Sequence, residues 1–121
     1  MATQLFADNT AATLASAISD SALSMTLTAG QGAQFPTPTG GDFFELTLID
    51  RMNAVEIGWE IVAVTARVGD VLTIARRAGA RAWSAGASLQ IRWTSSSIAR
   101  LRTEIASAGA SAVKQLFYAS F

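Results

Sequence analysis

Few side chains in this sequence could do chemistry, because it contains neither histidine nor cysteine. Their absence excludes a Ser-His-Asp triad, a thiolate nucleophile and a cysteine-based zinc or iron–sulfur site. General acid–base chemistry would then need two carboxylates with shifted pKa values, and Glu56 and Glu60 are the closest pair. They flank Gly58 in an apolar, β-branched stretch, where solvated or arginine-paired strand residues are the simpler interpretation. We therefore predict a protein that is not an enzyme, with no catalytic residue, no cofactor and no metal site.

A cluster of arginines close to a tryptophan is the second pattern of interest. Its members, which we take as candidate surface-recognition residues, are Arg76, Arg77, Arg81 and Trp83. Basic residues interleaved with aromatic ones are typical of nucleic-acid binding, but nine basic residues against nine acidic ones give no net attraction to nucleic acid. The favoured alternative is that the arginines lie at a subunit boundary and pair with carboxylates, while the tryptophan stacks as part of the packing. We expect neither a nucleic-acid partner nor membrane insertion, since no apolar run approaches the ~20 residues of a membrane span.

A third pattern is an apolar seam towards the C-terminus. Hydroxyl residues at 94–97 can cap a helix, and the apolar residues that follow are spaced by three and four, as in a heptad repeat. The seam consists of Ile98, Leu101, Ile105, Ala108 and Ala112. A helix of about two to three heptads does not hold together alone in water, so it must lie on its own β domain or bundle with copies of itself. Both alternatives stay open, and the seam is a candidate self-association surface.

The last pattern is aromatic and lies near the two ends of the sequence. Three aromatic residues fall within the last five, and no charged residue follows Lys114. Chain ends are usually polar, and so many aromatic rings are difficult to bury in one small domain. We therefore predict that an apolar set docks into a partner: Phe6, Leu116, Phe117, Tyr118 and Phe121. A charged fraction of 15%, against roughly 25% in typical proteins, also suggests that part of the surface is covered.

The elements that must position these residues are mainly strands. Phe44, Leu46 and Leu48 alternate with polar residues and are expected to face one way. Residues 55–68 are apolar and β-branched, with a bulge or bend expected at Gly58. A Gly-Asp pair at 69–70 predicts a two-residue hairpin turn before a return strand at 71–75. Residues 50–53 predict another turn, 76–86 a loop, and 89–93 a last strand.

These patterns predict a mainly β fold: a small sandwich or barrel of about five to seven strands, with an extended N-terminal arm and one C-terminal helix. We divide the chain into an arm at 1–22, a β domain at 23–94, a helix at 95–114 and an apolar tail at 115–121. The conformation of residues 5–18 stays open. Leu14 and Ile18 fit one side of a short helix, but several of their neighbours are weak helix formers, so an extended path is equally consistent.

A longer pattern of structural residues runs through positions 5–94. Its first half comprises Leu5, Phe6, Asn9, Leu14, Ala15, Ile18, residues 23–27, Gly30, Gly32, Phe35, Pro36, residues 41–44, residues 46–48 and Asp50. Its second half comprises residues 60–62, residues 64–67, Gly69, Asp70, Leu72, Thr73, Arg76, Ala82, Trp83, Ala85 and Gly86. The pattern contains no catalytic signature. It resembles the N-terminal segment of tailed-bacteriophage tail and tail-fibre-associated (baseplate) structural proteins.

The resemblance implies a virion structural protein at the tail tip or baseplate, where a small β domain joins the tail to fibres or receptor-binding proteins. The implied partners are copies of the chain itself, as a homotrimer, and other phage tail, baseplate or fibre proteins. The implied location is the virion tail, after synthesis in the host cytoplasm. Two alternatives are a carbohydrate-binding module that recognises the host through exposed tryptophan and arginine, and a capsid decoration protein.

Overall fold

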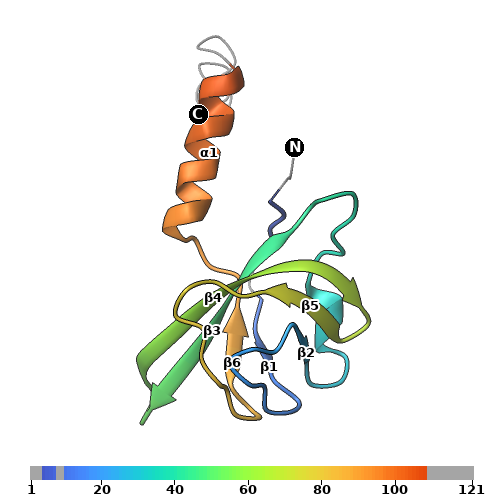
Figure 1. Cartoon of the computed structure of the whole chain (residues 1–121), viewed down its shortest axis with the longest axis vertical. Coiled ribbons are helices and arrows are strands. Elements are labelled where there is room, and N and C mark those ends of the chain that lie inside the picture. The colour runs from blue at the N-terminus through green and yellow to red at the C-terminus, as the bar shows by residue number, and fades with distance from the viewer. Residues whose placement is uncertain (1–3, 8–9, 109–121) are drawn as a thin grey trace.

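The computed structural model describes residues 4–7 and 10–108 of the chain, and within them it shows one curled antiparallel sheet and one α-helix (Figure 1). The strands are β1 Ala12–Thr13, β2 Ser24–Thr26, β3 Phe44–Met52, β4 Val55–Val68, β5 Val71–Ala75 and β6 Ser88–Gln90. A short 3-10 helix, Gln31–Gln34, follows β2, and the α-helix α1 spans Ser95–Ala108. The strands lie in the order β1-β6-β3-β4-β5-β2 and form a half-barrel, which confirms the predicted mainly β fold with one C-terminal helix.

The curl of the sheet comes from its two longest strands. The register of β3 against β4 shifts once, because Asp50 pairs with Gly58 while Arg51 pairs with Glu56. A second shift follows Val64, where β4 pairs with β5. Each shift leaves an extra residue on β4, and such bulges bend a strand and increase its twist. The irregularity that the sequence predicts at Gly58 is therefore confirmed.

The two edges of the curled sheet meet each other. Leu14, just after β1, forms an antiparallel bridge with Leu27, just after β2. Two backbone hydrogen bonds flank this bridge, from Ala15 to the carbonyl of Thr26 at 2.9 Å and from Thr28 to that of Thr13 at 2.9 Å. The unpaired backbone groups that edge strands normally present are thus used within the molecule.

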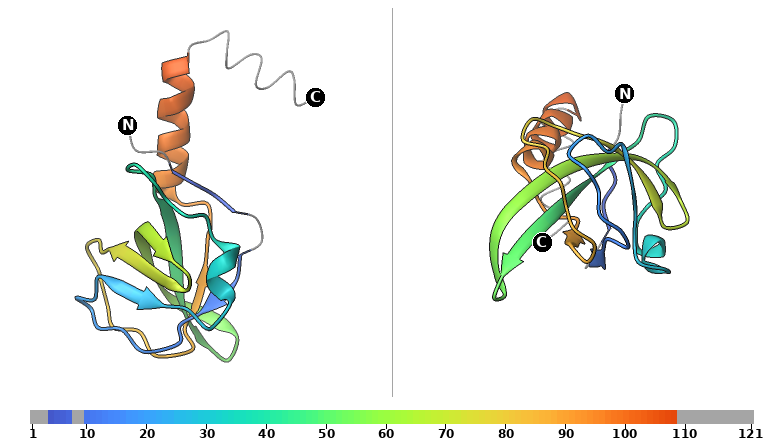
Figure 2. Two further views of the ribbon diagram at one scale, coloured as in Figure 1. Left: turned by 90° about the vertical axis from the view of Figure 1, so that its right-hand side faces the viewer. Right: turned by 60° about the horizontal axis from the view of Figure 1, so that its bottom comes forward.

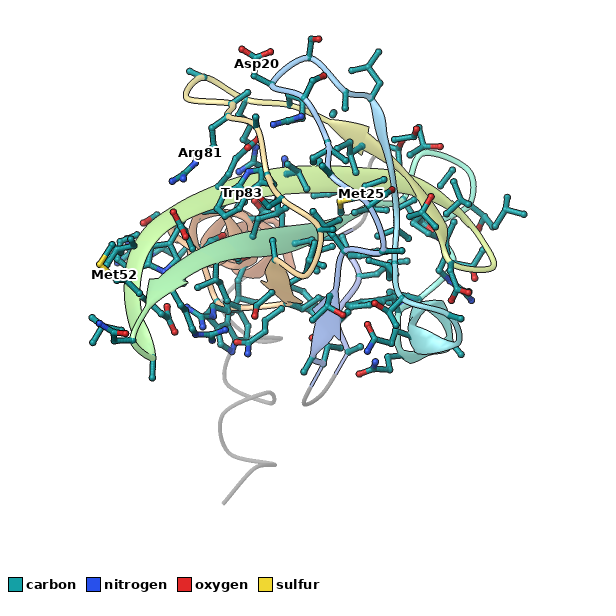
Figure 3. All side chains as sticks on the ribbon, turned by 90° about the horizontal axis from the view of Figure 1, so that it is seen from below. Asp20, Met25, Met52, Arg81 and Trp83 are labelled. Atoms are coloured by element: carbon teal, nitrogen blue, oxygen red, sulfur yellow. The ribbon has the colours of Figure 1, made fainter. Side chains whose placement is uncertain are left out.

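The hydrophobic core fills the concave side of the sheet. Phe44, Leu46 and Leu48 all point into it, as their alternation predicts, and each is fully buried. The ring of Phe35 stacks on that of Phe44 with centroids 5.6 Å apart. Val62, Val64, Leu72, Ile74 and Leu89 from the neighbouring strands complete the layer. Figure 3 views the molecule from below and shows Met25 and Trp83 directed into this core, whereas Met52 lies at the tip of the β3–β4 hairpin.

The N-terminal segment belongs to this core, which corrects the predicted boundary at residue 22. The segment runs extended, but Leu14 and Ile18 are buried in the chain's own core rather than laid on a neighbouring subunit. Ile18 and Trp83 exchange two backbone hydrogen bonds of 2.9 Å, so a distant loop fixes the segment in place. The physical reason is that a half-barrel has an open side, and apolar residues from elsewhere in the chain must cover it.

Two hairpin turns connect the central strands. The Gly-Asp turn is where the sequence predicts it, with Gly69 at φ +60° and Val68 paired with Val71. The carboxylate of Asp70 also accepts hydrogen bonds from the backbone of Gly30 and Gly32, at 3.1 and 2.8 Å. The turn predicted at 50–53 lies later, because β3 continues to Met52 and residues 53 and 54 form the turn, both with positive φ.

Helix α1 stands away from the β body (Figure 1, and the left view of Figure 2). The predicted strand at 89–93 is shorter than expected, since β6 ends at Gln90 and the chain then leads into the helix. Thr94 caps the helix: its side-chain oxygen accepts a hydrogen bond from the backbone of Ser97 at 3.0 Å. The prediction of hydroxyl capping at 94–97 is therefore confirmed. Residues 109–114 of the predicted helix and the tail at 115–121 lie outside the described residues.

Candidate functional site

Glu45 organises the base of the helix. It lies on the convex face of β3, opposite the core, and is only 1% exposed. Its two carboxylate oxygens accept hydrogen bonds or an ion pair at 2.6–3.0 Å from side chains of three separate segments: Gln4, Arg77, Thr94, Ser96 and Ser97. We call these six residues the Glu45 cluster. It ties the N-terminal segment, the loop after β5 and the first turn of α1 to one strand.

The Glu45 carboxylate is held in its ionised form. Burial opposes ionisation, but the hydrogen bonds from Ser96, Ser97, Arg77 and Thr94 outweigh it and lower the pKa of Glu45 below its ordinary value. The carboxylate also lies beside the N-terminal end of α1, where the helix dipole favours negative charge. Since the N-cap residue Thr94 and the first turn of α1 together supply three of the donors, the helix leaves the body in a fixed direction.

An apolar band lies next to the Glu45 cluster, formed by Phe6, Trp93, Ile98 and Leu101. The rings of Phe6 and Trp93 contact each other with centroids 5.2 Å apart. Ile98 and Leu101, the first two residues of the predicted seam, are 49% and 41% exposed. A small hollow of about 40 Å³ separates Leu101 from the two rings. The seam is thus about half exposed at its first two positions, and the choice between intramolecular packing and self-association stays a prediction.

Other residues in the first turns of the helix contact the body. Arg100 stacks on the ring of Phe43 at 4.5 Å, and Ser97 is buried in the Glu45 cluster. At about 100° per residue, Leu101 lies next to Ser97 and borders the same small hollow, whereas Ile98 points away from Arg100. Ile105 and Ala108 continue the seam by position in the last turns of α1, and Ala112 lies outside the described residues. The partner-docking residues Leu116, Phe117, Tyr118 and Phe121 lie outside them as well, whereas Phe6 is about half exposed.

A shallow hollow of about 370 Å³ adjoins the band on the convex face, and we call it the outer groove. Trp59 from β4 and Trp93 line it, and both are more than half exposed. The other residues that line it are Thr47, Ile61, Arg92, Thr94, Ser95 and Ser96. Trp93 also borders the smaller hollow beneath Leu101, so the band and the outer groove are continuous.

The charges beside the outer groove are neutralised within the molecule. Arg92 donates two hydrogen bonds to Glu56, of 2.7 and 2.9 Å, and the indole of Trp59 donates a third of 2.7 Å. Mainly through the hydrogen bonds from Arg92, and then through that from Trp59, the pKa of Glu56 falls to about 2. Arg51 adds an ion pair at 3.5 Å. The outer groove therefore offers aromatic surface without an uncompensated charge.

Two of the four candidate surface-recognition residues are buried, which corrects that prediction. Trp83 is 4% exposed and the side chain of Arg76 is 7% exposed. Both bind Glu60, a buried carboxylate on the core side of β4: Arg76 at 2.7 and 2.8 Å, and the Trp83 indole at 2.9 Å. The arginine pairing and tryptophan packing of the alternative interpretation thus occur within the chain's own β body, whereas its placement at a subunit boundary stays a prediction. Arg77 is partly exposed but engaged in the Glu45 cluster.

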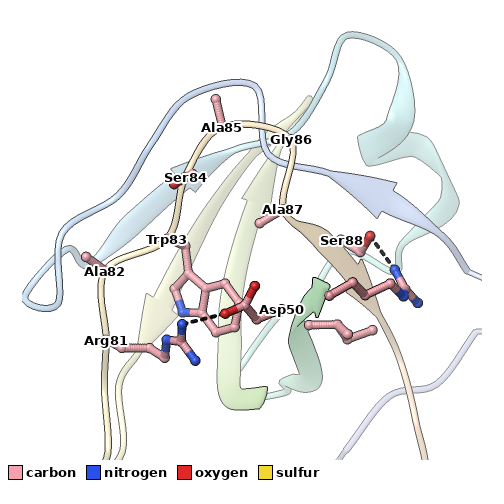
Figure 4. Close-up of a pocket in the computed structure, with 11 residues that line it drawn as sticks. Asp50, Arg81, Ala82, Trp83, Ser84, Ala85, Gly86, Ala87 and Ser88 are labelled. Atoms are coloured by element: carbon pink, nitrogen blue, oxygen red, sulfur yellow. Dashed lines mark hydrogen bonds and ion pairs between the residues drawn. The ribbon is translucent and has the colours of Figure 1, made fainter. Parts of the chain in front are cut away.

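Arg81, the fourth of these residues, is partly exposed and borders a hollow of about 290 Å³ beneath residues 82–87 (Figure 4). It stacks on Trp83 at 4.5 Å and forms an ion pair with Asp50 at 2.8 Å. Arg51 on the other side donates to Ser88 at 2.6 Å. The charged groups that line this hollow are thus already paired, and they offer little to an incoming ligand.

The carboxylate pair considered for acid–base chemistry does not form a site. Glu56 lies on the convex face and Glu60 on the core side, and each is paired with arginine, as the simpler interpretation holds. No group of three or more acidic side chains that could hold a metal ion occurs within residues 4–7 and 10–108. Over the same ranges, no helix combines the length and apolarity needed to cross a membrane.

The Glu45 cluster and the outer groove were not predicted from the sequence. One signal was available for the cluster: Glu45 stands alone among apolar and hydroxyl residues in β3, on the face opposite Phe44 and Leu46. For the outer groove, Trp59 and Trp93 lie in strand-like stretches, where aromatic residues are more often part of the core. No protein-family model matches the chain, and no curated protein is significantly similar to it.

Proposed function

We propose that this protein is a virion structural protein of a tailed bacteriophage, a tail-tip or baseplate subunit that joins the tail to fibres or receptor-binding proteins. The observation that carries an assembly role is a helix fixed to the body by the Glu45 cluster while Ile98 and Leu101 remain exposed. The place in a phage tail rests on the resemblance of residues 5–94. In this role the protein works by burying surface and performs no reaction.

The exposure of the seam supports self-association. A helix of 14 residues gains little stability from its own backbone in water, and most helices depend on an apolar face packed against something else. Here the polar cluster fixes only the first turn, and in the proposed assembly the seam beyond it packs against other helices. Fully burying one large aliphatic side chain contributes about 1.5–3 kcal/mol, and the isoleucines and the leucine of the seam are the residues that would gain it.

The proposed assembly is a homotrimer, as the resemblance implies. Three copies of α1 meet along Ile98, Leu101, Ile105 and Ala108, with Ala112 of the predicted seam beyond the described end of the helix, and the rings of Phe6 and Trp93 form a collar at the base of the bundle. Interfaces of standard size bury about 1,600 Å² in total, and aromatic anchors give such areas most of their binding energy. The paired rings at the base supply anchors of this kind.

The oligomeric mass tests this proposal. Light scattering on the full chain at micromolar concentration is expected to give a trimer, and the double variant Ile98→Gln, Leu101→Gln a monomer, because glutamine keeps helix propensity and removes the apolar contacts. The matched control is Val68→Thr with Val71→Thr, two exposed apolar residues on the β4–β5 hairpin, which should remain trimeric. A full-length chain that stays monomeric contradicts the proposal.

A carbohydrate-binding module is the second candidate function, and the exposure of Trp59 and Trp93 beside the outer groove favours it. Glycan-array binding that Trp93→Ala abolishes, without loss of folding, would support this role instead of assembly. Trp83 is unsuitable for that experiment because it is buried. Immunogold labelling of the virion separates a tail position from the remaining alternative, a capsid decoration protein.

A further inference from the structure

We infer that the outer groove is the docking site of residues 115–121 of this same chain, the apolar tail. The inference goes beyond the proposed function, because it names the occupant of the outer groove, which shares Trp93 with the proposed collar but whose Trp59 and Ile61 have no part in self-association through the helix. It rests on three features: the chemistry of the groove, the composition of the tail, and the length of chain that joins them.

The groove selects an uncharged, aromatic occupant. Its walls are the exposed faces of Trp59 and Trp93, with Ile61 between them. Its one cation, Arg92, is already bound by both oxygens of Glu56. A charged ligand would therefore lose hydration without gaining a free counter-charge. Aromatic side chains, in contrast, gain both burial and favourable ring contacts against tryptophan.

The tail has the matching composition. Residues 115–121 include four large apolar side chains and no charged one: Leu116, Phe117, Tyr118 and Phe121. The hollow of about 370 Å³ falls at the lower end of the range of roughly 300–1,000 Å³ that ligand pockets span. It therefore suits a few side chains of a short segment rather than a whole domain. Ser95, exposed at the rim, adds a hydroxyl for the polar atoms of such a segment.

The connecting chain has the right length. Helix α1 rises about 1.5 Å per residue, so Ala108 lies roughly 20 Å beyond Ser95 along the axis. Six residues, 109–114, separate Ala108 from the tail, and an extended chain of six spans roughly 20–22 Å. Reaching the level of the groove, on its own molecule or on a parallel neighbour in a helix bundle, requires residues 109–114 to run extended, so in the docked state the helical seam ends at Ala108 rather than at Ala112.

Disulfide trapping tests the inference, and the absence of native cysteine gives a clean background. The test variant carries Ser95→Cys and Ser120→Cys in the full chain. Ser95 is exposed and is not a member of the Glu45 cluster, so folding should persist. The matched control replaces it with Ser21→Cys, an exposed residue in a turn of the N-terminal segment, and keeps Ser120→Cys. We expect mild oxidation to cross-link most of the test variant and little of the control.

A non-reducing gel identifies which molecule supplies the tail, and either result supports the docking site. A cross-link between two chains places the tail on a neighbour, and a cross-link within one chain places it on its own body. Equal cross-linking of the test and control variants overturns the inference. A second measurement needs no cysteine: Phe117→Ser with Tyr118→Ser should shift tryptophan emission to longer wavelength, because Trp59 and Trp93 become hydrated. An unchanged spectrum overturns the inference as well.

These outcomes separate the inference from the proposed function. A trimeric mass without the specific cross-link removes the docking site and leaves the assembly role intact. A specific cross-link within one chain, together with a monomeric mass, establishes the docking site and removes the proposed assembly through the helix.

Discussion

Two buried glutamates on adjacent strands stabilise different parts of this molecule. Glu45 of β3 and Glu60 of β4 are 1% and 5% exposed, and they lie on opposite faces of the sheet. In both, burial opposes ionisation and a set of hydrogen bonds outweighs it, so both pKa values are lowered. Arg77 binds the first and Arg76 the second, two neighbours in the chain that point to opposite faces.

The difference lies in which segments each carboxylate joins. Glu60 holds the loop of Trp83 against the core, and its partner Arg76 also donates to the carbonyls of Ser19, Ala22 and Arg81 at 2.6–3.2 Å. Glu45 joins the N-terminal segment and the start of α1 to the body. The same kind of polar cluster thus closes the body on one face and orients a projecting helix on the other. The predictions below test that division.

The largest effect is expected for Glu60→Gln. The change leaves Arg76 buried without its counter-charge, and breaking a buried ion pair from one side costs about 3–5 kcal/mol. Urea unfolding, monitored by tryptophan fluorescence, should show this loss of unfolding free energy for the whole β body. Replacing both partners, Glu60→Leu with Arg76→Met, should recover much of it. A double variant that is no more stable than the single one would contradict the account of an unpaired buried charge.

A smaller and more local effect is expected for Glu45→Gln. The substitution keeps the shape of the side chain but weakens the hydrogen bonds that Glu45 accepts from its five partners. A hydrogen bond to a buried charged group is worth about 1.5–3 kcal/mol. Hydrogen exchange should speed up for the amides of α1 while those of β3 and β4 keep their protection. If Glu45→Gln lowers the stability of the body as much as Glu60→Gln does, the two glutamates do not differ in role.

Thr94→Ala should cost less again, about 1 kcal/mol, which is typical for loss of a helix N-cap. It removes the bond to the backbone of Ser97 and one donor to Glu45, so exchange should accelerate in the first turn of α1. Thr94→Ser, which retains the hydroxyl, is the matched control and should behave as the parent chain. Equal exchange rates in the two variants would remove Thr94 from the anchoring of the helix.

The smallest change is expected when the pH alone is varied near neutrality. Both glutamates have lowered pKa values in the folded state, so their stabilisation is complete above their ordinary pKa of 4.5 and is lost as the pH falls through the lower folded values. Unfolding free energy should therefore be flat from pH 7 to about 5 and should decline below 4.5. In Glu45→Gln, the decline in unfolding free energy that the amides of α1 report should become flatter. In Glu60→Gln, the decline reported by residues around Trp83 should become flatter. A decline that begins well above pH 5 would contradict this assignment.

The sequence predicts those features that depend on neighbouring residues. The alternation of Phe44, Leu46 and Leu48, the turn at Gly69 and the capping hydroxyls before α1 are local patterns, and all three are confirmed. The mainly β class follows from their sum. Boundaries proved less predictable, since β3 extends to Met52 and β6 stops at Gln90.

The features that sequence reasoning missed depend on contacts between distant segments. Nothing near Trp83 indicates that Ile18 pairs with it, so the sequence predicts a separate N-terminal arm and leaves Trp83 open between surface recognition and packing. The Glu45 cluster likewise draws its donors from both ends of the described chain. The heptad spacing of the seam is a local pattern, but the exposure of Ile98 and Leu101 depends on how the Glu45 cluster orients α1.

The bridge between Leu14 and Leu27 limits how copies of this protein can join. With β1 and β2 only two and three residues long and tied to each other beyond their ends, these two edges offer little main chain to a strand from another molecule. In the proposed assembly, contacts between copies at these edges are therefore expected to be made by side chains rather than by an added strand.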